Sequence, residues 1–306
     1  MNFIMMADSN YEFLLNLSVR KTMSLYPDAV IHVLDLGMSD SALTALSSLG
    51  VFIYEKSELA SLMANFPSPS QRRRMIIREI FKKRKIPNKN LRKLLYDNKR
   101  LYFECLCVYK PLFIRYILEK NKGDDFYLYL DADAFLLEPL DQLELFSGFV
   151  TVRFRQDISF DFGNMMIVNA GVAGFRSTKK GIDLVDKWLS ELKTSTANNF
   201  EQTALNCVAW DFELTDERFQ SAVIEDLDQL SGTELLVRDG VALGSCEYYN
   251  YYSTENLPSK SPGIVHFKGG VRSKEIQMAR LSEWGLVNAA EEPIPGSPIR
   301  GNNGGF

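Results

Sequence analysis

The sequence predicts an α/β protein in which a mostly parallel central sheet is covered by helices on both faces. Two observations support this prediction. Three short apolar runs, at 1–6, 29–37 and 51–54, alternate with segments of helical spacing, and this order is typical of parallel strands joined by helices. A further apolar run ends in two carboxylates, Asp131 and Asp133. Ligands of such sheets bind at the carboxyl ends of the strands.

The chain begins with an apolar run at 1–6 that passes directly into a polar segment. Because neither a basic start nor a small-residue cleavage site is present, we expect a strand of the fold and not a signal peptide. Asp8 and Asn10 are typical helix caps, and the apolar spacing that follows predicts a helix over 13–23. Asp8 and Tyr11 should therefore lie at the carboxyl end of the first strand.

The same pattern continues with a strand at 29–37, a helix at 39–49 and a third strand at 51–54. Together with the first strand and helix, these elements complete a β-α-β-α-β order. His32 lies inside the second strand, where we expect an ordinary buried histidine.

A strongly basic segment follows the third strand. Between 71 and 100 there are 13 Lys and Arg residues against two acids, whereas the rest of the chain carries 22 basic and 37 acidic residues. This segregation indicates either a solvated helical face or a surface for an anionic partner, namely a lipid surface, a phosphorylated acceptor or a charged glycan. No nucleic-acid-binding motif accompanies the charge, so we expect no nucleic-acid partner.

The elements after the basic segment are read from the same periodicities. A helix over 103–119 contains Arg115, for which we expect an anionic partner because burial of an unpaired guanidinium is costly. A small-residue strand at 167–175 indicates that some group approaches its backbone closely. The remaining predictions are a helix that opens at 140, strands at 149–154 and 264–266, helices at 179–192 and from 200, and a disordered tail at 291–306.

The strand at 126–130 carries the main chemical signal. Asp131 and Asp133 follow it, and alternate residues at the end of a strand face the same way. Two hard oxygen ligands suit Mg²⁺ or Mn²⁺, whereas the alternative is a helix cap with a solvated turn. A second Asp-x-Asp, Asp226 and Asp228, lies in a polar acidic stretch, where we expect a solvated loop or a helix start.

Length and composition limit the class of protein. A chain of 306 residues with 46% hydrophobic content can bury a full core, and we expect one domain over 1–290. No apolar run approaches the roughly 18 residues needed to cross a bilayer. The four cysteines form no Cys-x-x-Cys pair, so we expect reduced thiols and a cytoplasmic protein, peripheral on the inner face of the membrane if it contacts one.

Six short motifs occur in an order that resembles the glycosyltransferases of family eight, the glycogenin and lipopolysaccharide galactosyltransferase group, which have the Rossmann-like GT-A fold. The motifs are Ala-Asp-Ser-Asn-Tyr at 7–11, Val-Leu-Asp-Leu-Gly at 33–37, Tyr-Leu-Asp-Ala-Asp at 129–133, Asn-Ala-Gly-Val at 169–172, Glu-Gln at 201–202 and His-Phe-x-Gly-x-x-Arg at 266–272. The resemblance covers position 1 to about 275 except 65–100, which looks like a basic helical insertion.

The resemblance implies a metal-dependent, retaining transfer of a sugar from a nucleotide-sugar, most often a UDP-sugar, with Mn²⁺ or Mg²⁺ bound. The acceptor would be a glycan, a lipid-linked sugar or another hydroxyl compound, and the basic segment at 71–100 would contact an anionic membrane. Asp131, Asp133 and His266 would bind the metal, although a lone histidine of this kind is more often a satisfied core or surface residue. The nucleotide and diphosphate would be held by Asp8, Asn10, Tyr11, Arg115, Asp131, Ala132, Gly269 and Arg272. The catalytic residues would be Asn169, Glu201 and Gln202: Asn169 and Gln202 would contact the sugar near the anomeric carbon, and Glu201 and Gln202 are the candidates to test as the nucleophile.

Two positions depart from the pattern of that family. Glu201 stands where the family commonly has Asp, one methylene shorter, which leaves the donor sugar open. Arg272 stands where Lys is common, and a guanidinium can still clamp phosphates through two parallel hydrogen bonds.

Three other functions compete with this interpretation. A phosphohydrolase of the haloacid-dehalogenase type also uses a strand that ends in Asp-x-Asp, but its motif lies near the domain start and precedes Thr or Val, whereas Ala134 and Phe135 follow here. A sugar-phosphate nucleotidyltransferase would need a Gly-rich loop containing Arg after the first strand. A non-catalytic module could bind anionic surfaces through the basic segment.

Overall fold

The computed structural model describes residues 1–83, 97–153, 167–196, 200–210, 217–252, 261–267, 279, 281–282 and 284–286. The predictions for Gly269, for Arg272 and for the tail at 291–306 lie outside the described residues.

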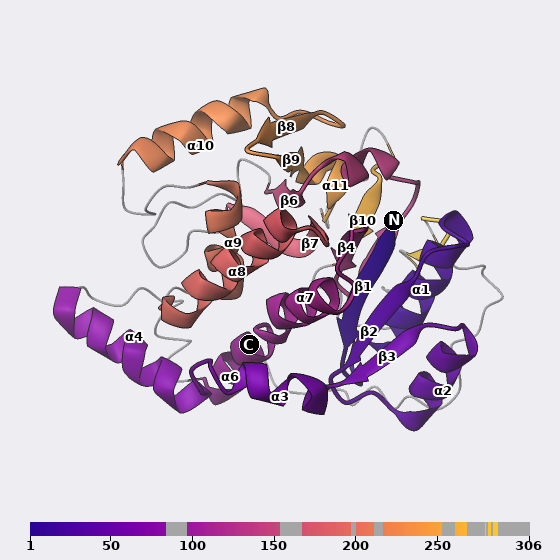
Figure 1. The fold of residues 1–306 in the computed structure, drawn as a ribbon, viewed down its shortest axis with the longest axis horizontal. Helices are drawn as coiled ribbons and strands as arrows, with labels where there is room; N and C mark the ends of the chain where they lie inside the picture. The colour runs from indigo at the N-terminus through magenta and orange to yellow at the C-terminus, as the bar shows by residue number, and fades with distance from the viewer. Residues whose placement is uncertain are drawn as a thin grey trace.

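An eight-stranded sheet forms the centre of the molecule in the order β3-β2-β1-β4-β7-β6-β9-β8 (Figure 1). Four of its seven neighbouring pairs are parallel, and the antiparallel pairs are β4 with β7, β6 with β7 and β8 with β9. A second, two-stranded sheet pairs β5 with β10 in antiparallel register. The strands are β1 (Asn2–Ala7), β2 (Ile31–Asp35), β3 (Phe52–Glu55), β4 (Phe126–Leu130), β5 (Ala134–Leu136), β6 (Gly148–Val152), β7 (Val168–Arg176), β8 (Leu235–Arg238), β9 (Val241–Ser245) and β10 (Ile264–His266).

Helices cover both faces of this sheet, as the sequence predicts. The α-helices are α1 (Glu12–Leu25), α2 (Asp40–Ser48), α3 (Ala60–Met63), α4 (Pro69–Lys83), α6 (Asn98–Leu106), α7 (Tyr109–Lys120), α8 (Lys179–Thr194), α9 (Phe200–Ala209), α10 (Glu217–Gln229) and α11 (Cys246–Tyr249), and the 3-10 helices are η1 (Lys56–Leu59) and η2 (Asp141–Leu145). Within the described residues, no helix combines the length and the apolar character that crossing a membrane requires.

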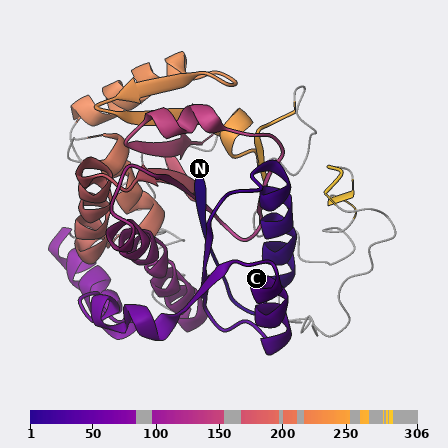
Figure 2. The same ribbon diagram turned by 45° about the vertical axis from the view of Figure 1, so that its right-hand side comes forward.

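The alternation of side chains along the strands produces two core layers. In β1, Phe3 and Met5 pack with α1 and α2 on one face, whereas Ile4 packs with α7, α8 and α9 on the other. Figure 2 shows the sheet between these two helical layers. Because these helical layers cover both faces of the sheet, the ends of the strands are the places where polar groups can form a site.

Helix α8 fixes the start of α9, which carries two candidate site residues. Val185, Trp188 and Leu192 recur at helical spacing and are fully buried against the sheet. The indole Nε1 of Trp188 donates to the backbone oxygen of Glu201 at 2.9 Å. The first turn of α9 is thereby held against the central layer.

Three local predictions need correction. The helix expected over 103–119 is two helices, α6 and α7, because Pro111 has no N–H to continue a helical ladder and is tolerated only in a first turn. The helix expected from 140 is only the short η2. Asp226 is not solvated: it lies in α10, is 8% exposed, and accepts hydrogen bonds from Trp210 and Arg238.

Candidate functional site

A cavity of about 410 Å³ opens at the carboxyl ends of β1 and β4. Its volume falls in the range of small-molecule sites. Among the residues that line it are Asp8 and Tyr11 after β1, Asp131, Ala132 and Asp133 after β4, Asn169 and Gly171 of β7, Glu201 and Gln202 of α9, and His266 of β10. The structure therefore brings most of the predicted site residues into one cavity.

Asp131, Asp133 and His266 form a compact cluster in this cavity. Each offers one ligand atom, and the three atoms lie within 4.8 Å of one another. Nε2 of His266 lies 3.1 Å from Oδ1 of Asp133 and 3.7 Å from Oδ2 of Asp131. The pairing of β10 with β5 sets His266 opposite Ala134, so the small second sheet delivers the imidazole to the two carboxylates.

Hydrogen bonds behind His266 determine which ring nitrogen carries the proton. The hydroxyl of Thr151 donates to the backbone oxygen of Asn169 at 2.9 Å, so it accepts from Nδ2 of Asn250 at 3.0 Å. Oδ1 of Asn250 then accepts from Nδ1 of His266 at 2.9 Å. In the neutral imidazole, the lone pair of Nε2 consequently faces the two carboxylates. Three acceptor groups directed at one place repel one another unless a cation lies between them, so the residues fit a divalent metal.

Lys110 of α7 places a cation beside the cluster. Its Nζ donates to the backbone oxygen of Ala170 at 2.9 Å and lies 3.1 Å from Oδ1 of Asp131 and 3.4 Å from Oε1 of Glu201. Burial disfavours the ammonium group, but the two carboxylates raise the pKa of Lys110 above its ordinary value. Lys110 therefore stays charged and offsets part of the acidic cluster.

The two carboxylates beside Lys110 have different protonation behaviour. Burial opposes ionisation of Asp131, but Lys110 holds the pKa of Asp131 below its usual value, and the hydroxyl of Tyr129 donates to it at 2.8 Å. For Glu201, burial raises the pKa to about 7, and Lys110 offsets only part of this rise. Oε1 of Glu201 is buried and faces the Nζ of Lys110 at 3.4 Å.

The side-chain amides of Asn169 and Gln202 are oriented by the backbone of β7. Oδ1 of Asn169 accepts from the N–H of Gly171 at 3.0 Å, and Oε1 of Gln202 accepts from the N–H of Ala170 at 3.3 Å. Because both oxygens are engaged, the amide N–H groups are available as donors. Nδ2 of Asn169 is buried and finds no acceptor within the residues described.

Gly171 explains why the strand at 167–175 is rich in small residues. A Cβ atom at this position would lie 2.3 Å from Cε1 of His266 and 2.8 Å from Oδ2 of Asp131. At Gly171 the groups that approach the backbone closely are the metal-ligand candidates themselves, whereas at Gly174 it is the ring of Phe126. Only glycine leaves room for them.

Not every predicted residue reaches the cavity. Arg115 does not line the cavity, and its guanidinium pairs with the surface carboxylates of Asp186 and Glu119. Asn10 is exposed and donates from both its backbone and its side chain to Asp8. Gly269 and Arg272 lie outside the described residues.

Two cations that line the cavity, Lys110 and Arg153, were not predicted from the sequence. A count of helical positions could have found Lys110, because it shares the buried face of α7 with Phe113, Ile114 and Ile117 at i+3, i+4 and i+7. Arg153 directly follows β6, and its buried Nε forms no hydrogen bond to a described residue. The sequence gives no comparable signal for Arg153.

Comparisons with known proteins agree with this architecture. The sequence matches no family model and no curated protein. Among solved structures, it is similar to the bifunctional glycosyltransferase WbbM, with 12% identity and a TM-score of 0.50 over 88% of this chain and 46% of the other. It is also similar to the galactosyltransferase LgtC in complex with donor and acceptor sugar analogues, with 15% identity and a TM-score of 0.41 over 95% of this chain and 98% of the other. The fold predicted from the sequence is confirmed: the chain has the mixed α/β architecture of the GT-A glycosyltransferases.

Proposed function

We propose that this protein is a metal-dependent glycosyltransferase that moves a sugar from a nucleotide-sugar, most simply a UDP-sugar, to a hydroxyl acceptor. One observation carries the proposal: Asp131, Asp133 and His266 direct three acceptor groups into a cavity at the carboxyl ends of parallel strands. The shared fold of the WbbM glycosyltransferase supports it. Family-eight membership and retention of anomeric configuration belong to the same proposal and rest on the motif order.

The three ligands favour Mn²⁺, because one imidazole beside two carboxylates suits manganese better than the all-oxygen shell that magnesium prefers. Bound there, a divalent ion would supply Lewis-acid stabilisation to a departing diphosphate. The chain contributes its own charge as well. Arg153 lines the same cavity, and Lys110 keeps the acidic cluster from repelling an anionic donor.

The remaining cavity residues would contact either the nucleotide or the sugar of the donor. Tyr11 and Asp8, at the end of β1, offer a ring for stacking and a carboxylate for ribose hydroxyls. The amide donors of Asn169 and Gln202 would meet hydroxyls of the sugar. In this proposal the nucleotide would lie against β1 and the sugar against β7 and α9.

The transfer itself needs one bond made and one bond broken. An acceptor hydroxyl attacks the anomeric carbon, the bond from that carbon to the diphosphate breaks, and the diphosphate leaves with the electron pair. In a retaining reaction by front-face attack, the hydroxyl proton passes to the departing phosphate oxygen. Gln202 cannot act as a carboxylate nucleophile, and Glu201 is held by Lys110, so in this proposal both residues position the sugar.

The test is calorimetric titration of UDP into the full chain with Mn²⁺, with EDTA and with the variant Asp133→Asn. We expect binding that requires both the metal and Asp133. The matched control is Asp228→Asn, which changes the exposed residue of the second Asp-x-Asp and should leave binding intact.

Binding that persists equally in EDTA and in Asp133→Asn would overturn the metal-dependent donor site. If UDP does not bind under any condition, other nucleoside diphosphates are titrated in the same way, and failure of all of them would overturn the proposed function. Release of phosphate from simple phosphomonoesters that depends on Asp131 would favour the phosphohydrolase alternative instead.

A further inference from the structure

Helix α4 presents an unusual solvent-facing stripe. Arg74, Ile77, Arg78, Phe81 and Lys82 recur at intervals of three, four and seven residues and are all exposed. Phe81 is 77% exposed. An exposed aromatic residue alone needs no explanation, but large apolar side chains set among three cations on one helical face are typical of helices that lie in a membrane interface.

The opposite face of α4 is anchored firmly to the body of the protein. Arg72 is fully buried, donates to the backbone oxygens of Leu192 and Ser195 at the end of α8, and lies 4.3 Å above the ring of Phe200. Ile76 is buried against Leu101 of α6. Because these contacts fix the orientation of α4, the exposed stripe is a defined surface and not one side of a freely rotating helix.

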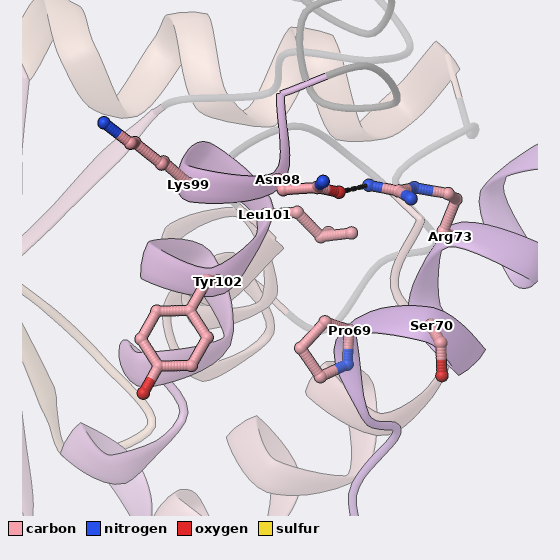
Figure 3. Close-up of a pocket in the computed structure, with 7 residues that line it drawn as sticks. All are labelled: Pro69, Ser70, Arg73, Asn98, Lys99, Leu101 and Tyr102. Carbon is pink, nitrogen blue, oxygen red and sulfur yellow. Dashed lines mark hydrogen bonds between the residues drawn. The ribbon is translucent and has the colours of Figure 1, made fainter.

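Helix α6 extends this surface toward the candidate active site. Tyr102 and Phe103 are 59% and 53% exposed. Tyr102 lines a cavity of about 520 Å³ between α4 and α6, together with Arg73 and Asn98, whose side chains are hydrogen-bonded to each other (Figure 3). Phe103, the next residue, lines the active-site cavity. One short helix thus separates the two cavities, and Figure 1 shows α4 at the outer edge of the molecule.

We propose that α4 and the adjoining face of α6 dock on an anionic lipid bilayer. Arg74, Arg78 and Lys82 would contact lipid phosphates, and Ile77 and Phe81 would enter the boundary between headgroups and acyl chains. The three cations favour an anionic surface because their charge is complementary to it. The exposed apolar side chains favour a bilayer over a soluble polyanion. The cavity beside Tyr102 has room for a lipid headgroup, with Arg73 in its wall.

Docking in this way would bring Phe103, and with it the side of the active-site cavity formed by α6, close to the membrane surface. An acceptor carried by a lipid would then approach along α6. This consequence rests on the proposed function, but the docking itself does not. The experiment therefore measures membrane binding in the absence of nucleotide.

The test is co-sedimentation of the full chain with phosphatidylcholine vesicles, with and without a phosphatidylglycerol fraction. We expect binding only to the anionic vesicles. The triple variant Arg74→Gln/Arg78→Gln/Lys82→Gln should bind about 100-fold more weakly, since each cation near an anionic surface contributes roughly fivefold. The matched control, Lys122→Gln/Lys179→Gln/Lys187→Gln, removes the same charge from exposed positions after α7 and on α8 and should bind like the unmodified protein.

A second pair of variants tests the apolar contribution. Phe81→Ser should weaken vesicle binding roughly tenfold, whereas Leu145→Ser, which changes an even more exposed apolar residue on η2, should not weaken it. In Phe81→Trp, the added tryptophan fluorescence should shift to the blue on anionic vesicles, and in Leu145→Trp it should not. Unchanged melting temperatures would show that the variants fold.

Three outcomes would overturn the proposal. One is equal binding to neutral and anionic vesicles, or binding to neither. Another is a loss in the control triple variant as large as that in the α4 triple variant. The third is vesicle binding that is unchanged in Phe81→Ser and is displaced by duplex DNA or a soluble sulfated glycan. This surface would then be a site for soluble polyanions.

Discussion

Nδ1 of His266 lies 2.9 Å from Oδ1 of Asn250, and this hydrogen bond turns Nε2 of the imidazole toward Asp131 and Asp133. Asn250 is itself fully buried and fixed by the hydroxyl of Thr151. The candidate metal site is therefore oriented from behind by a residue that lies outside the cavity lining. Such supporting hydrogen bonds commonly tune metal affinity.

Replacement of Asn250 should weaken the metal site without removing a ligand. In Asn250→Ala, we expect Mn²⁺ affinity to fall about 10- to 100-fold, because the ring of His266 loses the acceptor that fixes its tautomer. Asn250→Asp keeps an acceptor oxygen and should retain more affinity than the alanine variant. Calorimetry gives the affinities, and ¹⁵N NMR of the imidazole reports the tautomer. An unchanged affinity and tautomer in Asn250→Ala would contradict the role.

Gly171→Ala should damage the site by crowding. The added methyl group would lie 2.3 Å from Cε1 of His266 and 2.8 Å from Oδ2 of Asp131, so both side chains must move. We expect loss of most Mn²⁺ affinity and destabilisation by about 1–3 kcal/mol. Gly123→Ala is the control, since its methyl group would meet no atom closer than 3.9 Å. The idea fails if Gly171→Ala binds Mn²⁺ as tightly as Gly123→Ala does.

Lys110 and Arg115 occupy the same helix but should respond very differently to substitution. Lys110→Met leaves the buried Glu201 and the half-buried Asp131 without their cation, so we expect a loss of about 3–5 kcal/mol in the free energy of unfolding. Arg115→Met breaks partly exposed ion pairs and should cost less than about 1 kcal/mol, with no effect on UDP binding. Urea unfolding of both variants measures the difference.

The double variant Lys110→Met/Glu201→Gln separates charge from packing. Removal of the carboxylate should recover part of the stability lost in Lys110→Met. Burial already raises the pKa of Glu201 to about 7, so without Lys110 this carboxyl must take up a proton on folding, and the glutamine avoids that cost. Additive losses in the double variant would show that the methionine side chain fails to pack and that the ion pair is not the cause.

The contrast between Lys110 and Arg115 also shows what the sequence can and cannot predict. Asp131 and Asp133 are predictable because their meeting depends only on strand alternation over two residues. Lys110 and Arg115 are both helical cations in an apolar stretch, and the choice between them depends on which face of α7 packs on the sheet. The spacing of the apolar residues contains that information, but the charge alone does not.

Site residues that meet only through contacts between elements far apart in the sequence could not be predicted. Asn250 reaches His266 only because β10 is placed beside β5 and the segment after α11, and no local pattern encodes that placement. Arg153 likewise enters the cavity through the position of β6 in the sheet. The parallel half of the fold, by contrast, follows from strand and helix periods that are visible in the sequence.

His32 should make the protein less stable in acid. Burial, with a smaller effect from the charge of Lys120, lowers the pKa of His32 from 6.5 to about 4, and Nδ1 already engages the hydroxyl of Tyr54 at 3.0 Å. Between these two values the unfolded chain binds a proton that the folded protein does not. The free energy of unfolding must therefore fall as the pH drops from about 6.5 toward 4, with a contribution of about 2 kcal/mol from His32 at pH 5.

Urea unfolding at pH 7 and pH 5, in EDTA so that metal binding does not contribute, measures this effect. The difference between the two pH values should be smaller by about 2 kcal/mol in His32→Gln than in the unmodified protein, whatever the stability of the variant itself. All other titrating groups are common to both proteins and cancel in the comparison. An identical pH dependence in the two proteins would mean that His32 titrates normally in the folded state, and its burial against β3 would then have to be incomplete.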